Sequence, residues 1–183
     1  GQTTAEISDS FEILITPAGY VFSIWGLIYL GLSAFVIYQL ISAEHSGVVT
    51  RRVGPWFIIS SLANMGWLLL WHYNQIPLSL VAMLVLLVSL IMIYLRLDIG
   101  RREVSRPVKW FVHVPFSIYL GWITVATIVN ASVVLESLGW NGFGLSEPLW
   151  TVIMLAVATA VALVVARTRW DVAYLLVLVW AFV

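Results

Sequence analysis

Long apolar segments, separated by short polar or Gly/Pro-rich connections, dominate this sequence. A helix crosses the roughly 30 Å hydrocarbon core of a bilayer with about 20 apolar residues, because each residue rises about 1.5 Å. Five segments are long enough to span in this way, whereas the sixth is too short as it stands. The six segments cover residues 18–42, 55–73, 78–97, 108–133, 149–166 and 170–183.

A membrane environment accounts for these segments, since 62% of the 183 residues are hydrophobic and only 10% are charged. A soluble chain of this length has no interior large enough to hide so much apolar surface. None of the segments alternates with a period of two, which disfavours a β-barrel, whereas helices satisfy their backbone groups without water. The sequence therefore predicts an all-α integral membrane protein. Pro115 lies inside a predicted span, where we expect a kink or a late helix start.

All nine Lys and Arg residues fall in every second connection. This alternation follows the positive-inside rule, by which basic connections stay in the cytoplasm. We therefore expect a bacterial inner-membrane protein whose acidic N-terminal segment 1–16 and loop 134–148 lie outside. The net charge is zero, which gives no basis for nucleic-acid binding and leaves membrane lipid as the partner of these charges. The predicted cytoplasmic connections are 43–54, 96–109 and 167–171.

Residues able to carry catalysis or bind a metal are few. The chain has no cysteine, and its predicted spans have no Asp, Glu, Lys or Arg away from their ends. His72 and His113 are weak candidates, each of which could by itself ligate the metal of a haem or chlorin. Each is explained more simply as a histidine at the membrane interface that bonds to backbone or water. No metalloprotease, hydrolase or P-loop motif occurs. The sequence therefore favours no enzyme activity.

Several aromatic, amide and small residues recur at helical spacing deep within the predicted spans. Five tryptophans near segment ends fit interface anchors (Trp56, Trp110, Trp140, Trp150 and Trp170), but others lie deeper. Neighbours three or four positions apart share one helix face. Such faces turn away from lipid, because an unpaired amide there is costly. The candidate site residues are Trp25, Tyr29, Asn64, Trp67, Trp122, Ala126 and Asn130.

Two interpretations of these faces stay open. In the first, Asn64 and Asn130 bond across a helix interface, and Gly66 and Ala126 let the helices approach closely. In the second, the indole, phenol and amide groups line a cleft for a flat hydrophobic ligand with polar edges.

Three motifs in order along the chain add a resemblance. They are P-x7-W-G-x2-Y in PAGYVFSIWGLIY, L-x-N-x2-W in LANMGW and W-x3-A-T-x2-N in WITVATIVN. Together these motifs resemble those of the tryptophan-rich sensory protein/translocator protein (TspO/MBR) family. The resemblance covers about residues 17–131 and corresponds to four of the family's five helices. It implies a further helix before residue 1, so we expect the chain to be trimmed at one or both ends.

The resemblance implies a helical bundle with a pocket for porphyrins, haem-related tetrapyrroles, sterols or similar lipid-soluble ligands, used in sensing or regulation. Trp67 and Trp122 would flank the ligand, Asn64 and Asn130 would bond its polar edge or each other, and Ala126 would leave it room. Porphyrin breakdown would be implied by the resemblance alone. The predicted division is an acidic segment 1–16, a TspO-like bundle 17–133, a loop 134–148 and about two additional spans in 149–183.

Other functions remain open beside ligand binding. The additional spans would suit a structural or accessory subunit of a larger membrane complex, for example a photosynthetic or respiratory one. Bound pigment or lipid would then be incidental. A homodimer is the other assembly left open, and a discrete homodimer would count against the accessory subunit. A transporter is disfavoured because the spans lack coupling charges and a visible repeat.

Overall fold

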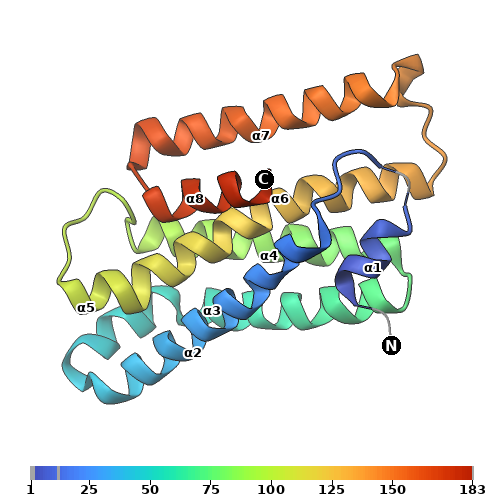
Figure 1. Ribbon diagram of the computed structural model, residues 1–183. Helices are drawn as coiled ribbons and strands as arrows, with labels where there is room; N and C mark the ends of the chain where they lie inside the picture. The colour runs from blue at the N-terminus through green and yellow to red at the C-terminus, as the bar shows by residue number, and fades with distance from the viewer. Residues whose placement is uncertain (1–2, 12, 183) are drawn as a thin grey trace.

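The computed structural model describes residues 3–11 and 13–182, without the side chains of residues 43–48 and 50. All regular structure in these residues is helical, and long helices lie side by side in a bundle (Figure 1). The α-helices are α1 (Thr4–Asp9), α2 (Ile24–Ile41), α3 (Ala43–His72), α4 (Ile76–Arg96), α5 (Arg106–Val108), α6 (Val114–Ser137), α7 (Glu147–Arg169) and α8 (Val172–Ala181). Shorter turns of other helix types are η1 (Gly19–Ser23), η2 (Lys109–His113) and η3 (Gly142–Gly144).

The structure confirms the all-α membrane prediction. Five helical stretches are long and apolar enough to cross a bilayer, and α8 adds a shorter apolar helix of 10 residues. Each of the five corresponds to one of the five long apolar segments of the sequence. The stretches are Gly19–Ile41, Arg51–His72, Ile76–Arg96, Arg106–Ser137 and Glu147–Arg169.

The three basic connections meet at one end of the bundle. Arg52 and Arg96 each donate to the other's backbone carbonyl, at 3.5 and 3.3 Å. On the neighbouring side, Arg169 forms an ion pair with Asp98 at 2.7 Å. The N-terminal α1 and the connection between α6 and α7 lie at the other end (Figure 1). The charge alternation in the sequence thus reflects a real separation of the two ends.

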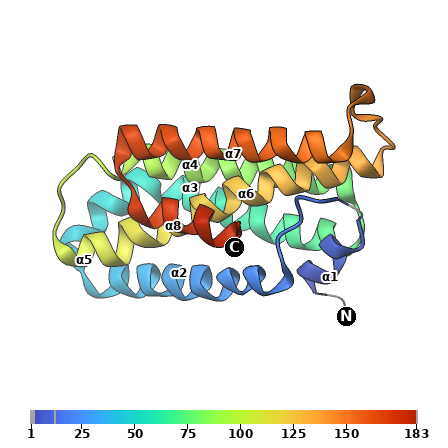
Figure 2. The ribbon, with the colours of Figure 1, turned by 45° about the horizontal axis from the view of Figure 1, so that its top comes forward.

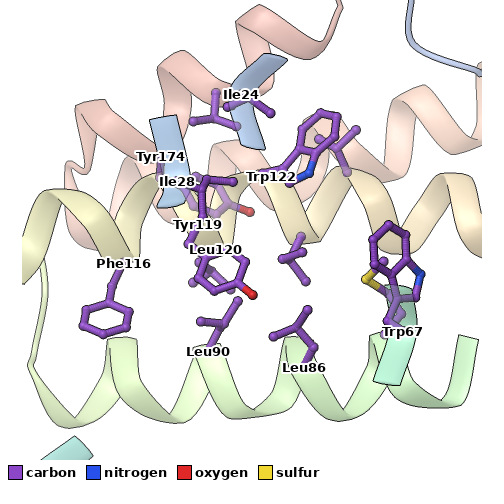
Figure 3. Packing of buried hydrophobic residues seen from close by; sticks show 14 of the residues in the cluster. Ile24, Ile28, Trp67, Leu86, Leu90, Phe116, Tyr119, Leu120, Trp122 and Tyr174 are labelled. Carbon is purple, nitrogen blue, oxygen red and sulfur yellow. The ribbon is translucent and has the colours of Figure 1, made fainter. Parts of the chain in front are cut away.

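Helix α6 forms the centre of the packing. It contacts α4, α8 and α2, and most of its side chains from Pro115 to Val134 are buried. Figure 3 shows Leu86 and Leu90 of α4 facing Tyr119 and Leu120 of α6. All four side chains are at most 5% exposed. Tyr119 of this interface also meets Trp25 of α2 edge-on, with ring centroids 6.2 Å apart.

Helix α7 lies at the edge of the bundle. It runs beside α8 and α6 (Figure 2), but Ala158 is its only buried residue. The rest of its surface is dominated by valine and leucine, which suits contact with lipid tails.

Two predicted boundaries are wrong. Residues 43–54 do not form a loop, because α3 begins at Ala43 and continues through Pro55 to His72. A helix need not end at the membrane surface, and Arg51 and Arg52 within α3 are exposed. The outer loop 134–148 is also too long, since α6 ends at Ser137 and α7 begins at Glu147.

The expected disturbance near Pro115 is a π-helical turn. Residues Lys109–His113 form this turn directly before α6, so the helix widens where the proline lacks its N–H. Pro115 also lies against Gly31 of α2, where an added Cβ would come within 3.2 Å of the proline side chain. The proline therefore lies at a close helix contact, which small residues permit.

Candidate ligand pocket

Three deep tryptophans from three helices meet in one cluster. Trp25 of α2 stacks on Trp67 of α3, with ring centroids 5.7 Å apart and planes inclined by 24°. Trp122 of α6 meets Trp25 edge-on at 6.3 Å. Tyr29 also stacks on Trp25, with ring centroids 5.7 Å apart. The packing of α2, α3 and α6 thus brings these side chains together.

A small cavity of about 20 Å³ lies against this cluster. That space suffices for about one water molecule. Its floor comes from α6, its walls from the tryptophans, and its cover from α1, whose Thr4 and Ser8 line it. The residues lining the cavity are Thr4, Ser8, Pro17, Phe22, Trp25, Trp67, Trp71, Trp122, Ala126, Val129 and Asn130.

Buried polar atoms at the cluster lack hydrogen-bond partners among the described residues. The indole nitrogens of Trp25, Trp67 and Trp122 are all buried and unpaired, as is the Oδ1 atom of Asn64. A buried donor without a partner costs about 1–3 kcal/mol. Three such donors in one cluster are rare in a folded protein.

The two asparagines do not bond each other. Asn64 donates from Nδ2 to the hydroxyl of Tyr29 at 3.2 Å. Asn130 donates from Nδ2 to Oγ of Ser79 at 3.1 Å, and Ser79 in turn donates to the carbonyl of Ile76 at 2.7 Å. Asn130 therefore joins α6 to α4, in the manner of helix–helix association in membranes.

Five of the seven candidate site residues line the cavity: Trp25, Trp67, Trp122, Ala126 and Asn130. Tyr29 and Asn64 lie behind it as a bonded pair, and Tyr29 is 42% exposed. Thr127 bonds back to the carbonyl of Ile123 in its own helix.

The sequence interpretation did not include Trp71 among the site residues. Its indole nitrogen donates to the carbonyl of Thr4 at 3.3 Å and so ties α1 to α3. Its spacing of four residues from Trp67, on which it stacks at 5.8 Å, was the available signal. Ser79 gave no comparable signal, because serine recurs throughout the apolar segments.

The histidines do not gather with other metal ligands. No group of three or more His, Cys, Asp or Glu able to share a metal occurs in the part of the chain that the structure describes. His72 is exposed and its Nδ1 lies 2.8 Å from the carbonyl of Leu68, whereas His113 is buried as the last residue of the π-helical turn.

A buried carboxylate ties three helices together at the basic end. Asp171 is 7% exposed and accepts hydrogen bonds from the hydroxyls of Tyr94 and Ser117 at 2.9 and 2.6 Å. Its other oxygen accepts from the backbone N–H of Tyr174 and caps α8. These contacts join α4, α6 and α8 at one point. The residue therefore has a structural role.

The bundle, its spans and its aromatic cluster define a polytopic helical membrane protein with a tryptophan-lined pocket. The family model described as TSPO-like protein matches residues 1–183. The chain therefore belongs to the TSPO-like family, and the likeness extends beyond residues 17–131 to include α7 and α8. No curated protein and no solved structure matches the chain significantly.

Proposed function

We propose that the protein binds a flat hydrophobic molecule with hydrogen-bond-accepting edges, of the porphyrin or tetrapyrrole type, at the tryptophan cluster. The observation that carries this proposal is the set of three buried indole donors without partners. A ligand with several acceptor atoms would satisfy them together. The cavity lining has no charged side chain, so the wall suits the apolar body of such a ligand.

Ligand binding at this place requires α1 to move. The cavity of about 20 Å³ is far too small for a tetrapyrrole while α1 covers it. Helix α1 has only six residues. It is held in place by the hydrogen bond from the Trp71 indole to the Thr4 carbonyl and by burial of Ile7 and Ser8. Displacement of so short a segment would convert ligand occupancy into a change on the surface of the protein. Such a change would serve a sensory or regulatory role.

The orientation follows from the positive-inside rule. We place the basic end in the cytoplasm and α1 outside, in a bacterial inner membrane. The pocket would then open on the side opposite the basic connections.

Titration of protoporphyrin into the purified protein tests the pocket. Tryptophan fluorescence and the porphyrin absorption band report binding. We expect saturable quenching, with about 3- to 10-fold weaker binding in Trp67→Phe and Trp122→Phe, because each variant removes one donor but keeps an aromatic ring. Trp110→Phe is the matched control, since Trp110 is 63% exposed and lies near the basic end. Linear quenching that no variant changes would refute the proposal.

A second candidate function is that of an accessory subunit in a larger membrane complex. Helix α7 favours it, because almost its entire apolar surface is free to contact another protein. The same surface could instead join two copies of this chain in a homodimer. Purification in a mild detergent would reveal a stoichiometric partner or a dimer. A monodisperse monomer would count against this function.

A further inference from the structure

A second and larger cleft lies between α7 and the rest of the bundle. One cavity of about 300 Å³ lies at the end near α1, and another of about 210 Å³ lies deeper along α6. Leu14, Ile15 and Thr151 line both cavities, so the two are adjoining parts of one elongated cleft. The turn before Pro17 forms one wall, and α7 forms the other.

The outer part of this cleft is acidic and aromatic. Glu136 and Glu147 line it together with the indoles of Trp140 and Trp150. No Lys or Arg belongs to its lining, because the basic residues lie at the opposite end of the bundle. Carboxylates beside indole rings form the surroundings that attract an ammonium group.

The aromatic rings are held in place by the protein. The indole nitrogen of Trp150 donates to the carbonyl of Gly142 at 2.7 Å. Trp140 packs against Trp150 with centroids 4.8 Å apart, and Phe143 meets Trp140 edge-on at 5.1 Å. Ring positions fixed in advance lower the entropic cost of binding a ligand.

One carboxylate of the pair is already positioned. Oε1 of Glu147 accepts the backbone N–H of Leu14 at 3.2 Å, which fixes the side chain at the rim of the cleft. Its second oxygen has no protein donor among the described residues and is available to a cation.

Most side chains that line the inner part of the cleft are apolar. They include Val125 and Ile128 of α6, Leu155 and Ala158 of α7, and Ala181 at the end of α8. Thr16 and Thr151 are the polar side chains of this lining, and the buried Oγ1 atom of Thr16 has no hydrogen-bond partner among the described residues. From Val125 to Glu136 the cleft extends roughly 16 Å along α6 at about 1.5 Å per residue. The cleft therefore has a polar end at the membrane surface and an apolar end within the bilayer.

We infer that this cleft binds an amphiphile with an ammonium headgroup and an alkyl chain. The headgroup lies between the two glutamates and the indoles, the chain fills the gap between α6 and α7, and the hydroxyl of Thr16 donates to an ester or other acceptor between them. The source of the amphiphile is either a membrane lipid with a choline headgroup or a free alkylammonium compound. The inner part of the cleft shares Pro17 and Val129 with the tryptophan-lined cavity, whereas none of the residues that line the outer part lines that cavity. Variants at the outer part therefore test this site without changing the tryptophan cluster.

Two measurements distinguish the sources. In the first, the protein is reconstituted in nanodiscs of equal parts phosphatidylcholine and phosphatidylglycerol, and native mass spectrometry identifies the retained lipid. In the second, dodecyltrimethylammonium is added to protein purified in a neutral detergent, and the thermal unfolding temperature is compared with that in dodecanol. Preferential retention of phosphatidylcholine identifies a lipid. A rise in unfolding temperature with the ammonium compound alone identifies a free amphiphile.

The Glu136→Gln and Glu147→Gln double variant completes the test. Glutamine keeps the acceptor for Leu14 but removes the charge, so the fold is retained. We expect the lipid preference or the stabilisation to weaken about tenfold. Glu103→Gln, an exposed acid in the connection after α4, is the matched control and leaves both unchanged. Equal retention of both lipids, together with no specific effect of dodecyltrimethylammonium, overturns the inference. So does a preference that the double variant preserves.

Discussion

The bond between Asn130 and Ser79 allows a quantitative test of how the bundle is held together. Asn130 is 2% exposed and Ser79 is fully buried, and Asn130 donates to Ser79 at 3.1 Å. The two single substitutions are not equivalent. Ser79→Ala leaves the Asn130 amide buried without this partner, whereas Asn130→Ala leaves Ser79 its bond to Ile76.

The magnitude follows from this asymmetry. An unpaired buried amide costs about 1–3 kcal/mol, and measured side-chain couplings between membrane helices average about 0.6 with a maximum near 1.7 kcal/mol. We therefore expect Ser79→Ala to cost about 0.6–1.7 kcal/mol more in the wild-type background than in the Asn130→Ala background. The double-mutant cycle isolates that coupling from the volume that each substitution removes.

Unfolding in mixed micelles of dodecyl sulfate and a neutral detergent, followed by circular dichroism, measures the free energies of all four proteins. Thr159→Ala serves as a control, because the Thr159 hydroxyl is exposed and bonds within its own helix. If Ser79→Ala costs the same in both backgrounds, the two side chains do not interact, and the account of Asn130 as a link between α6 and α4 is wrong.

Three further changes probe other parts of the molecule. Asp171→Ala leaves two buried hydroxyls and one helix N-terminus without their acceptor, so we expect about 3 kcal/mol or more of lost stability in the same unfolding assay, and a smaller loss for Asp171→Asn. Gly100→Ala places a Cβ against the backbone carbonyl of Arg169 at a φ of +81°. We expect this change to lower the free energy of unfolding by about 1–3 kcal/mol and with it the unfolding temperature measured by circular dichroism. Hydrogen bonds from Thr3 lower the pKa of Glu6 below its ordinary value of 4.5, so its contribution to α1 is complete above that pH and is lost as the pH falls through the lowered pKa. Hydrogen exchange of α1 amides should then accelerate on acidification beyond the intrinsic rate change, and Glu6→Gln should remove that dependence.

Hydropathy and charge were sufficient to predict the spans and the grouping of the basic connections, because burial in hydrocarbon and the cost of moving charges across it act on every residue alike. Hydropathy and charge were not sufficient to predict which buried side chains bond to one another. The four-residue spacing of Trp122 and Asn130 placed both on one face of α6, but the rotation of α4 that brings Ser79 to that face depends on packing. The position of α1 over the cavity could not be predicted either, because a six-residue helix has no periodic signal of its own.

The loop boundaries failed for a related reason. Polar residues mark the edge of the hydrocarbon, not the end of a helix, and so the polar start of α3 was read as a connection. Asp171 shows the same limit in the other direction. It belongs to the predicted cytoplasmic connection 167–171, yet two hydroxyls and one N–H stabilise it in the interior.

The central place of α6 has a consequence for biosynthesis. Thr124 and Ser117 of this helix are bonded to residues 50 and 54 positions later in the chain. Because α6 is synthesised before α8, its face toward α8 has no neighbour until the later stretch has been made. At Gly121 this face is smooth enough for α8 to pack directly on it, with an added Cβ only 3.0 Å from Val177. The packing around α6 is therefore complete only once α8 is in place.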